Sequence, residues 1–133
     1  DIIVTHDAVR PFVNERIISD NIELAQKYGA TNTVIGCVDT ILMSRDGVFA
    51  GDVPDRKSLF RVQTPQTFRF SLLWDVISSA GNDELERYSD TAGLVMAHGA
   101  KIALVNGEES NIKITTPFDL AVAENICAEN QLV

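Results

Sequence analysis

Runs of β-branched residues alternate along this chain with segments of helical periodicity, and this alternation constrains the fold more than any other feature. Ile2 to Val4 predicts a buried strand, and the next helix is expected to run from an Asn14 N-cap to a Gly29 stop. Strands that alternate with helices form a largely parallel sheet covered on both faces, so the sequence predicts an α/β fold. The other expected strands are 33–38, 59–63, 101–105 and 111–115, and the other expected helices begin at Ser71, Ser89 and Thr116.

One segment departs from this order. Two short apolar runs, 40–43 and 48–50, flank the turn sequence Ser44-Arg45-Asp46-Gly47, which is typical of a β-hairpin. Neither run has an evident partner in the expected core. We therefore expect residues 37–60 to form a ribbon that protrudes from the domain, with a flexible surface loop as the alternative.

Composition excludes several classes of protein. The chain has 133 residues, enough for one domain, and a net charge of −8, which argues against nucleic acid as a partner. No apolar run approaches the ~20 residues of a membrane-spanning helix. Cys37 and Cys127 lack the spacing of metal ligands, and we expect reduced core thiols in a cytoplasmic protein rather than a disulfide.

Polar side chains collect where the expected strands end. Asp7 and Arg10 follow the first strand, Thr64 and Gln66 follow the strand 59–63, and Lys113 and Thr115 lie in the expected strand before the last helix. Ligands of open α/β sheets bind beyond the carboxyl ends of the strands, so these residues predict a binding site. Each residue alone has a structural explanation, such as capping a turn or lying at a sheet edge. A basic segment at Arg56, Lys57, Arg61 and Arg69 suits a small phosphorylated ligand or, alternatively, a solvated loop.

Motifs that would bind a nucleotide through glycines do not occur in these 133 residues. The eight glycines form neither a P-loop nor a GxGxxG turn, and the two histidines give no metal-ligand cluster. The chain also begins at Asp1 and enters a strand directly. We therefore expect it to be a piece of a longer protein.

Four segments, in this order, resemble the sugar-alcohol-phosphate cytidylyltransferases: THDAVRPF (5–12), DRKSLFRVQTPQTF (55–68), YSDTAGL (88–94) and SNIKITTPFDLAVAE (110–124). The resemblance covers residues 1–133 and implies the carboxyl-terminal part of one nucleotidyltransferase domain, with a three-layer Rossmann-like fold. The family's glycine-rich loop lies in an amino-terminal half outside this sequence. The implied reaction joins CMP from CTP to an alcohol phosphate and releases pyrophosphate, with Mg²⁺ bridging the phosphates.

The resemblance also implies a role for each matched residue. Lys113 would hold the attacking phosphate in line and contact the nucleotide phosphates, and Arg56 would clamp the substrate phosphate. Asp7 would bind hydroxyl groups and lie near the metal, whose other ligands are unknown. The backbone at Ala8 would lie beside the nucleotide ribose. The residues matched to the alcohol-phosphate pocket are Arg10, Thr40, Thr64 and Ser89, where the family pattern has threonine in place of Ser89.

Dimerisation and the identity of the alcohol follow from the same resemblance. Residues 37–60 would form a β-arm that embraces a second subunit, so that Thr40 and Arg56 complete the neighbouring site of a homodimer. The first two motifs favour ribitol 5-phosphate, a teichoic-acid precursor, whereas SDTAGL favours 2-C-methyl-D-erythritol 4-phosphate, an isoprenoid precursor. We expect ribitol 5-phosphate. The competing interpretation is that the 133 residues alone form a non-catalytic piece for dimerisation or polyol-phosphate binding.

Overall fold

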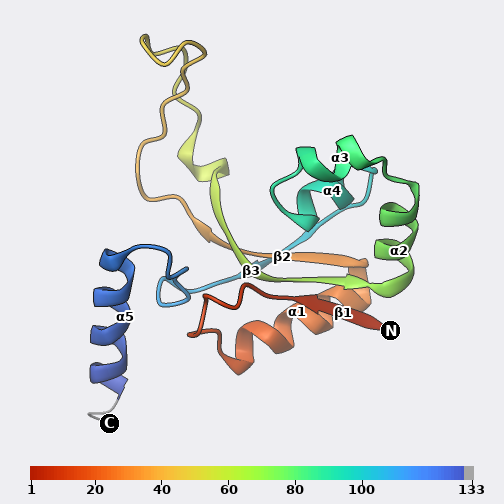
Figure 1. Ribbon diagram of the computed structural model, residues 1–133, viewed down its shortest axis with the longest axis horizontal. Coiled ribbons are helices and arrows are strands. Elements are labelled where there is room, and N and C mark those ends of the chain that lie inside the picture. The colour runs from red at the N-terminus through yellow and green to blue at the C-terminus, as the bar shows by residue number, and fades with distance from the viewer. Residues whose placement is uncertain (131–133) are drawn as a thin grey trace.

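A computed structural model describes residues 1–130, which form a four-stranded sheet with helices on both faces (Figure 1). The strands lie in the order β1-β3-β2-β4. Their bounds are β1 Ile2–Thr5, β2 Ala30–Gly36, β3 Phe60–Arg69 and β4 Ala103–Asn106. The helices are α1 Glu15–Tyr28, α2 Phe70–Ser79, α3 Asn82–Arg87, α4 Thr91–Ala97 and α5 Pro117–Asn130, with a 3₁₀ turn at Arg56–Ser58. The predicted α/β class is confirmed.

The strand directions correct the expectation of a largely parallel sheet. β2 and β4 pair in parallel, whereas β3 lies between β1 and β2 and pairs with both in the antiparallel sense. β1, β2 and β4 therefore run in one direction and β3 runs against them. Helical periodicity between strands predicts crossovers, but the chain reaches β3 through the segment 37–59, which contains no α-helix and reverses the chain.

Helix α1 covers one face of the sheet, and its termini follow the sequence prediction. The Asn14 side chain accepts a hydrogen bond from the Ile17 N–H at 3.0 Å, and Gly29 ends the helix with a φ of 96°. Gly29 can adopt this left-handed conformation because it has no Cβ. Ile17 and Ala25 are fully buried against the strands.

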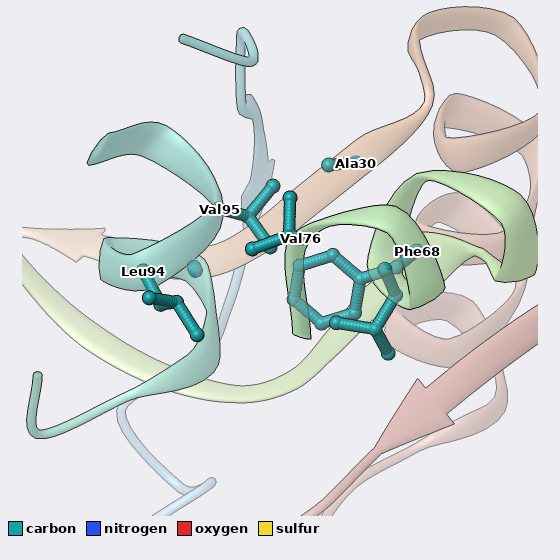
Figure 2. Packing of buried hydrophobic residues seen from close by; sticks show 7 residues of the cluster. Ala30, Phe68, Val76, Leu94 and Val95 are labelled. Carbon is teal, nitrogen blue, oxygen red and sulfur yellow. The ribbon is translucent and has the colours of Figure 1, made fainter. Parts of the chain in front are cut away.

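The opposite face of the sheet is covered by α2 and α4, which enclose the main hydrophobic cluster (Figure 2). Phe68 of β3 is fully buried there among Val76 of α2 and Leu94 and Val95 of α4. The sheet therefore lies between two helical layers, as a three-layer fold requires. This packing places the loop before α4 beside the end of β1.

Several predicted boundaries are wrong. α2 begins at Phe70, so Ser71 lies inside the helix, and Asp90 rather than Ser89 caps α4. β3 continues through a cis Thr64–Pro65 bond instead of ending near Gln63. Segment 111–115 forms no strand, and helix α3 had no clear sequence signal.

The segment 37–60 protrudes from the sheet, as predicted, but it is not a regular hairpin (Figure 1). The predicted turn is present, with a φ of 74° at Gly47 and the Ser44 hydroxyl bonded to the Phe49 carbonyl at 2.7 Å. Beyond the hydrogen bonds at its base, the two arms pair as strands only in an isolated bridge between Met43 and Asp52. Two-stranded ribbons are marginal in isolation, which explains the short pairing.

The cysteines differ from their predicted positions, whereas the last helix begins where the sequence predicts. Cys37 is half-buried and Cys127 exposed, both as free thiols, so the prediction of core positions is wrong. Helix α5 begins as predicted, because Asp119 accepts from the Thr116 backbone N–H at 2.8 Å and donates its own N–H to the Thr116 hydroxyl. Within residues 1–130, no helix is both long and apolar enough to cross a membrane.

Candidate functional site

Three charged side chains meet beyond the end of β1. The Asp7 carboxylate oxygen Oδ2 lies 3.2 Å from Arg10 Nε and 3.2 Å from Lys113 Nζ. The Arg10 side chain is 11% exposed and that of Lys113 is 48% exposed, so the guanidinium is fixed while the ammonium faces solvent. The two cations share one carboxylate, which leaves an excess of positive charge at this position.

Both cations favour the ionised form of Asp7. Partial burial acts to raise the pKa of this carboxyl, but the hydrogen bonds and charges of Lys113 and Arg10 outweigh burial, so the pKa lies below its ordinary value. Asp7 is therefore an anion at neutral pH. Since both cations contact Oδ2, the other carboxylate oxygen is free to bind a ligand.

The turn after β1 holds Asp7 in place through Thr64 of β3. The Thr64 hydroxyl oxygen accepts the Asp7 backbone N–H at 3.0 Å and lies 2.9 Å from His6 Nδ1. His6 Nε2 lies 2.9 Å from the Arg10 carbonyl, and because a carbonyl oxygen only accepts, Nε2 carries the hydrogen. Thr64 is among the residues predicted from the sequence, whereas His6 is not, because its partners come from two separate segments.

A second wall is formed by the loop before α4. The Gln66 side chain, 3% exposed, donates to Asp90 Oδ2 at 2.6 Å and accepts from the Ala92 N–H at 3.1 Å. Asp90 in turn caps α4 by accepting from the Gly93 N–H at 3.1 Å. These bonds fix the loop that carries Ser89 next to β3.

The two walls enclose a hollow of about 320 Å³. Five of the predicted site residues line it together: Asp7, Arg10, Thr64, Ser89 and Lys113. Gln66, which the sequence also places beyond the strand 59–63, lines it as well, whereas no site role follows from the sequence for Thr5, His6, Val62, Gln63, Asp90 and Thr91. Strand alternation and an N-cap signal at Asp90 could have indicated some of them, but which side chains share a wall depends on the pairing of β1 with β3.

The other three predicted residues lie elsewhere. Ala8 is exposed in the turn after β1 and does not line the hollow. Thr40 and Arg56 are exposed on the protruding segment, where the Arg56 guanidinium donates to the Val38 carbonyl at 3.1 Å. Within one chain, neither Thr40 nor Arg56 belongs to the hollow.

The donor set suits phosphate better than a tightly held metal. Ammonium and guanidinium groups bind phosphate through charge-assisted hydrogen bonds, and one of each faces the hollow beside the hydroxyl groups of serine and threonine side chains. Across residues 1–130, no three His, Cys, Asp or Glu side chains are grouped to hold a metal ion. Mg²⁺ commonly binds through one or two carboxylates and substrate phosphates, and Asp7 can supply one such ligand.

Comparison with known proteins assigns the family. A family model described as 2-C-methyl-D-erythritol 4-phosphate cytidylyltransferase, IspD, matches residues 1–129. The crystal structure of this cytidylyltransferase from Thermus thermophilus is 38% identical over 96% of the chain, with a TM-score of 0.83. A 4-diphosphocytidyl-2C-methyl-D-erythritol synthase from Anaerococcus prevotii is 29% identical over 96%, and the Francisella tularensis IspD is 26% identical over 93%, both with TM-scores of 0.83.

The chain spans 62%, 56% and 58% of the length of these three structures. The resemblance seen in the four sequence motifs is therefore confirmed, and it extends over nearly all the residues that the structure describes. The preference for the ribitol branch is not supported, because the matched family and the structures name methylerythritol. The chain belongs to the 2-C-methyl-D-erythritol 4-phosphate cytidylyltransferase (IspD) family.

Proposed function

We propose that the protein containing this chain transfers a cytidylyl group from CTP to 2-C-methyl-D-erythritol 4-phosphate. An oxygen of the substrate phosphate attacks the α-phosphorus of CTP, the bond to the β-phosphate oxygen breaks, and pyrophosphate leaves. The observation that supports this most is the meeting of Asp7, Arg10 and Lys113 at one hollow, in a chain of this family. The catalytic contribution of such a site is positioning and neutralisation of charge.

Lys113 is the residue that we assign to the reacting phosphates. Its ammonium is half-exposed at the mouth of the hollow, so it can exchange its contact with Asp7 for contacts with incoming phosphate oxygens. Two phosphates that approach each other repel, and a cation between them lowers this repulsion. Mg²⁺, when bound with CTP, would supply further neutralisation of the phosphate charge, with Asp7 as a ligand from this chain.

The alcohol phosphate is assigned to the inner part of the hollow. Arg10 is nearly buried and held by two acceptors, Asp7 Oδ2 at 3.2 Å and the Asn111 carbonyl at 2.7 Å, which makes it a rigid positive wall. Thr64 and Ser89 provide hydroxyl groups on opposite walls. Asp7 and Ala8, at the turn after β1, are assigned to the hydroxyl groups of the alcohol and of the nucleotide ribose.

Thr40 and Arg56 are assigned to the site of a second subunit. Apolar side chains of residues 41–53 on the protruding segment are 40–74% exposed, which favours burial against a partner: Ile41, Leu42, Met43, Val48, Phe49 and Val53. Neither polar residue reaches the hollow of its own chain. A homodimer in which each arm extends to the neighbouring hollow would bring the Arg56 guanidinium to the substrate phosphate.

The test compares two alcohol phosphates in the full-length protein. Pyrophosphate release should require CTP together with 2-C-methyl-D-erythritol 4-phosphate, and ribitol 5-phosphate should support much slower release. A higher kcat/KM for ribitol 5-phosphate would refute the assignment to methylerythritol and support the ribitol 5-phosphate substrate that the first two motifs favour. No release with either alcohol, from protein shown to be folded, would refute the proposed activity.

A further inference from the structure

The segment that carries Lys113 has no regular secondary structure, although this lysine is assigned to the reacting phosphates. Residues 107–116 connect β4 to α5 without a strand or helix. No strand ladder or helix therefore fixes the backbone at Lys113, and a loop residue depends on contacts with the rest of the fold for its position. Such contacts must determine where the Lys113 ammonium lies, since a misplacement of about 1 Å can cost roughly 100-fold in rate.

Asn111, two residues before Lys113, is one fixed point of this segment, and the Ile114 N–H, which donates to the Val9 carbonyl at 2.9 Å, is another. The Asn111 side chain is fully buried, and Nδ2 donates to the Thr64 carbonyl at 2.9 Å and to Gln63 Oε1 at 3.2 Å. Both acceptors belong to β3. The carboxamide therefore joins the irregular segment to the centre of the sheet.

The main chain of Asn111 is held as well. Its carbonyl accepts from Arg10 Nη1 at 2.7 Å, and the same guanidinium donates through Nε to Asp7 at 3.2 Å. The Lys113 ammonium contacts the same Asp7 oxygen. Asn111 thus contacts the cluster of Asp7, Arg10 and Lys113 in two ways. Its carbonyl holds Arg10, and its main chain leads directly to Lys113.

The carboxamide of Asn111 uses its two donors and leaves its acceptor without a partner within residues 1–130. Asn111 Oδ1 is buried and has no hydrogen-bond partner among the described residues. A buried acceptor without a partner is unfavourable, so the favourable contribution of this side chain comes from its two N–H groups, which satisfy acceptors on β3. With two N–H groups on one nitrogen, this short side chain donates to both Gln63 and Thr64.

We propose that Asn111 is a positioning residue whose carboxamide sets the place of the Lys113 ammonium relative to Asp7 and the reacting phosphates. The proposal rests on the function proposed above for Lys113. Asn111 itself does not line the hollow. Its effect passes through the backbone of residues 111–113 and through Arg10.

Three substitutions in the full-length protein vary the number of hydrogen-bond donors on the side chain at position 111. Asn111→Ser keeps one donor, Asn111→Ala keeps none, and Asn111→Asp keeps the shape while its ionised form has none. We expect kcat to fall about 10- to 100-fold for Asn111→Ala, with both KM values changed by less than about 3-fold, and a smaller fall for Asn111→Ser. If Asn111→Ala and Asn111→Asp fail to fold, Asn111→Ser carries the comparison.

The matched control is Asn21→Ala. Asn21 is also fully buried and donates to the Ile17 carbonyl and the Thr33 hydroxyl, both at 2.8 Å, but it lies on α1 and contacts none of the site residues. It should lower the melting temperature while kcat stays near wild type. A fall in kcat for Asn111→Ala no larger than for Asn21→Ala would show a merely structural role and overturn the proposal.

Hydrogen exchange gives a readout that does not depend on activity. The Ile114 N–H donates to the Val9 carbonyl at 2.9 Å, so exchange of peptides within 108–115 reports how firmly the segment is held. Exchange there should quicken in Asn111→Ala and stay unchanged in α1. Unchanged exchange at 108–115 would overturn the proposal whatever the kinetics. Absence of cytidylyl transfer by the wild-type protein would refute the proposed function, and the exchange pattern would still decide whether Asn111 fixes this segment.

Discussion

Replacing Lys113 with alanine separates the energetic role of this lysine in folding from its role in the reaction. In the structure its ammonium contacts Asp7 at 3.2 Å with 48% of the side chain exposed. An exposed ion pair of this kind contributes between about 0 and 1 kcal/mol to stability, because water screens it and the side chain loses freedom. The free energy of unfolding should therefore fall by no more than about 1 kcal/mol.

The loss in the reaction should be larger. A cation held against reacting phosphates in a partly desolvated hollow contributes on the order of 2–4 kcal/mol, which corresponds to about 30- to 1,000-fold in rate. Because the charge that Lys113 opposes grows in the transition state, the loss should fall mainly on kcat.

Steady-state kinetics of the full-length protein with CTP and 2-C-methyl-D-erythritol 4-phosphate would measure the effect, and urea unfolding would measure stability. Lys27→Ala serves as the control, because Lys27 lies at the end of α1 over the Tyr28 ring, away from the hollow. A kcat for Lys113→Ala within about 3-fold of wild type would refute the assignment of this ammonium to the reacting phosphates. A rise confined to KM would mean that Lys113 binds the ground state and the transition state equally.

Four further outcomes are expected. Residues 1–133 alone should release no pyrophosphate from CTP with either alcohol phosphate, since they contain no glycine-rich phosphate loop; turnover by a preparation free of longer enzyme would contradict this. Deletion of 43–49, with its ends joined, should convert a full-length dimer to monomer in light scattering, and an unchanged mass would exclude the arm as the interface. Mixed dimers of Arg56→Ala and Lys113→Ala subunits should regain up to half of the wild-type activity per dimer, because one site then has both residues; no recovery despite subunit exchange would place Arg56 in its own subunit's site. The pKa of Asp7 is lowered in the folded state, so Asp7 contributes stability that is present above its unfolded pKa of about 3.8 and lost as pH falls through the lower folded pKa. Melting temperatures should therefore decline less steeply for Asp7→Asn than for wild type as the pH falls below about 4, and parallel curves would refute the coupling.

Features that depend on residues close together in the chain could be predicted from the sequence alone. Asn14 with Ile17, Thr116 with Asp119, and the Ser44–Phe49 turn are local hydrogen-bonded units, and each is found where its residue types predict it. The sequence also places Asp7 and Arg10 together beyond the first strand, and the structure shows that they form an ion pair at 3.2 Å. The four sequence motifs likewise indicate the family without reference to the fold.

Features that depend on distant partners are set by the assembled fold. The placement of β3 between β1 and β2, against their direction, follows from pairing along whole strands and not from any local signal. Segment 111–115 has the composition of a strand, but Asn111 is bonded to β3 through its side chain and to Arg10 across 101 positions, so the segment forms no ladder. The wall formed by Gln66 and Asp90 likewise joins residues 24 positions apart. A contact between distant positions is stable only when the rest of the fold has already brought both residues together, and for that reason these parts of the site could not be predicted from the sequence.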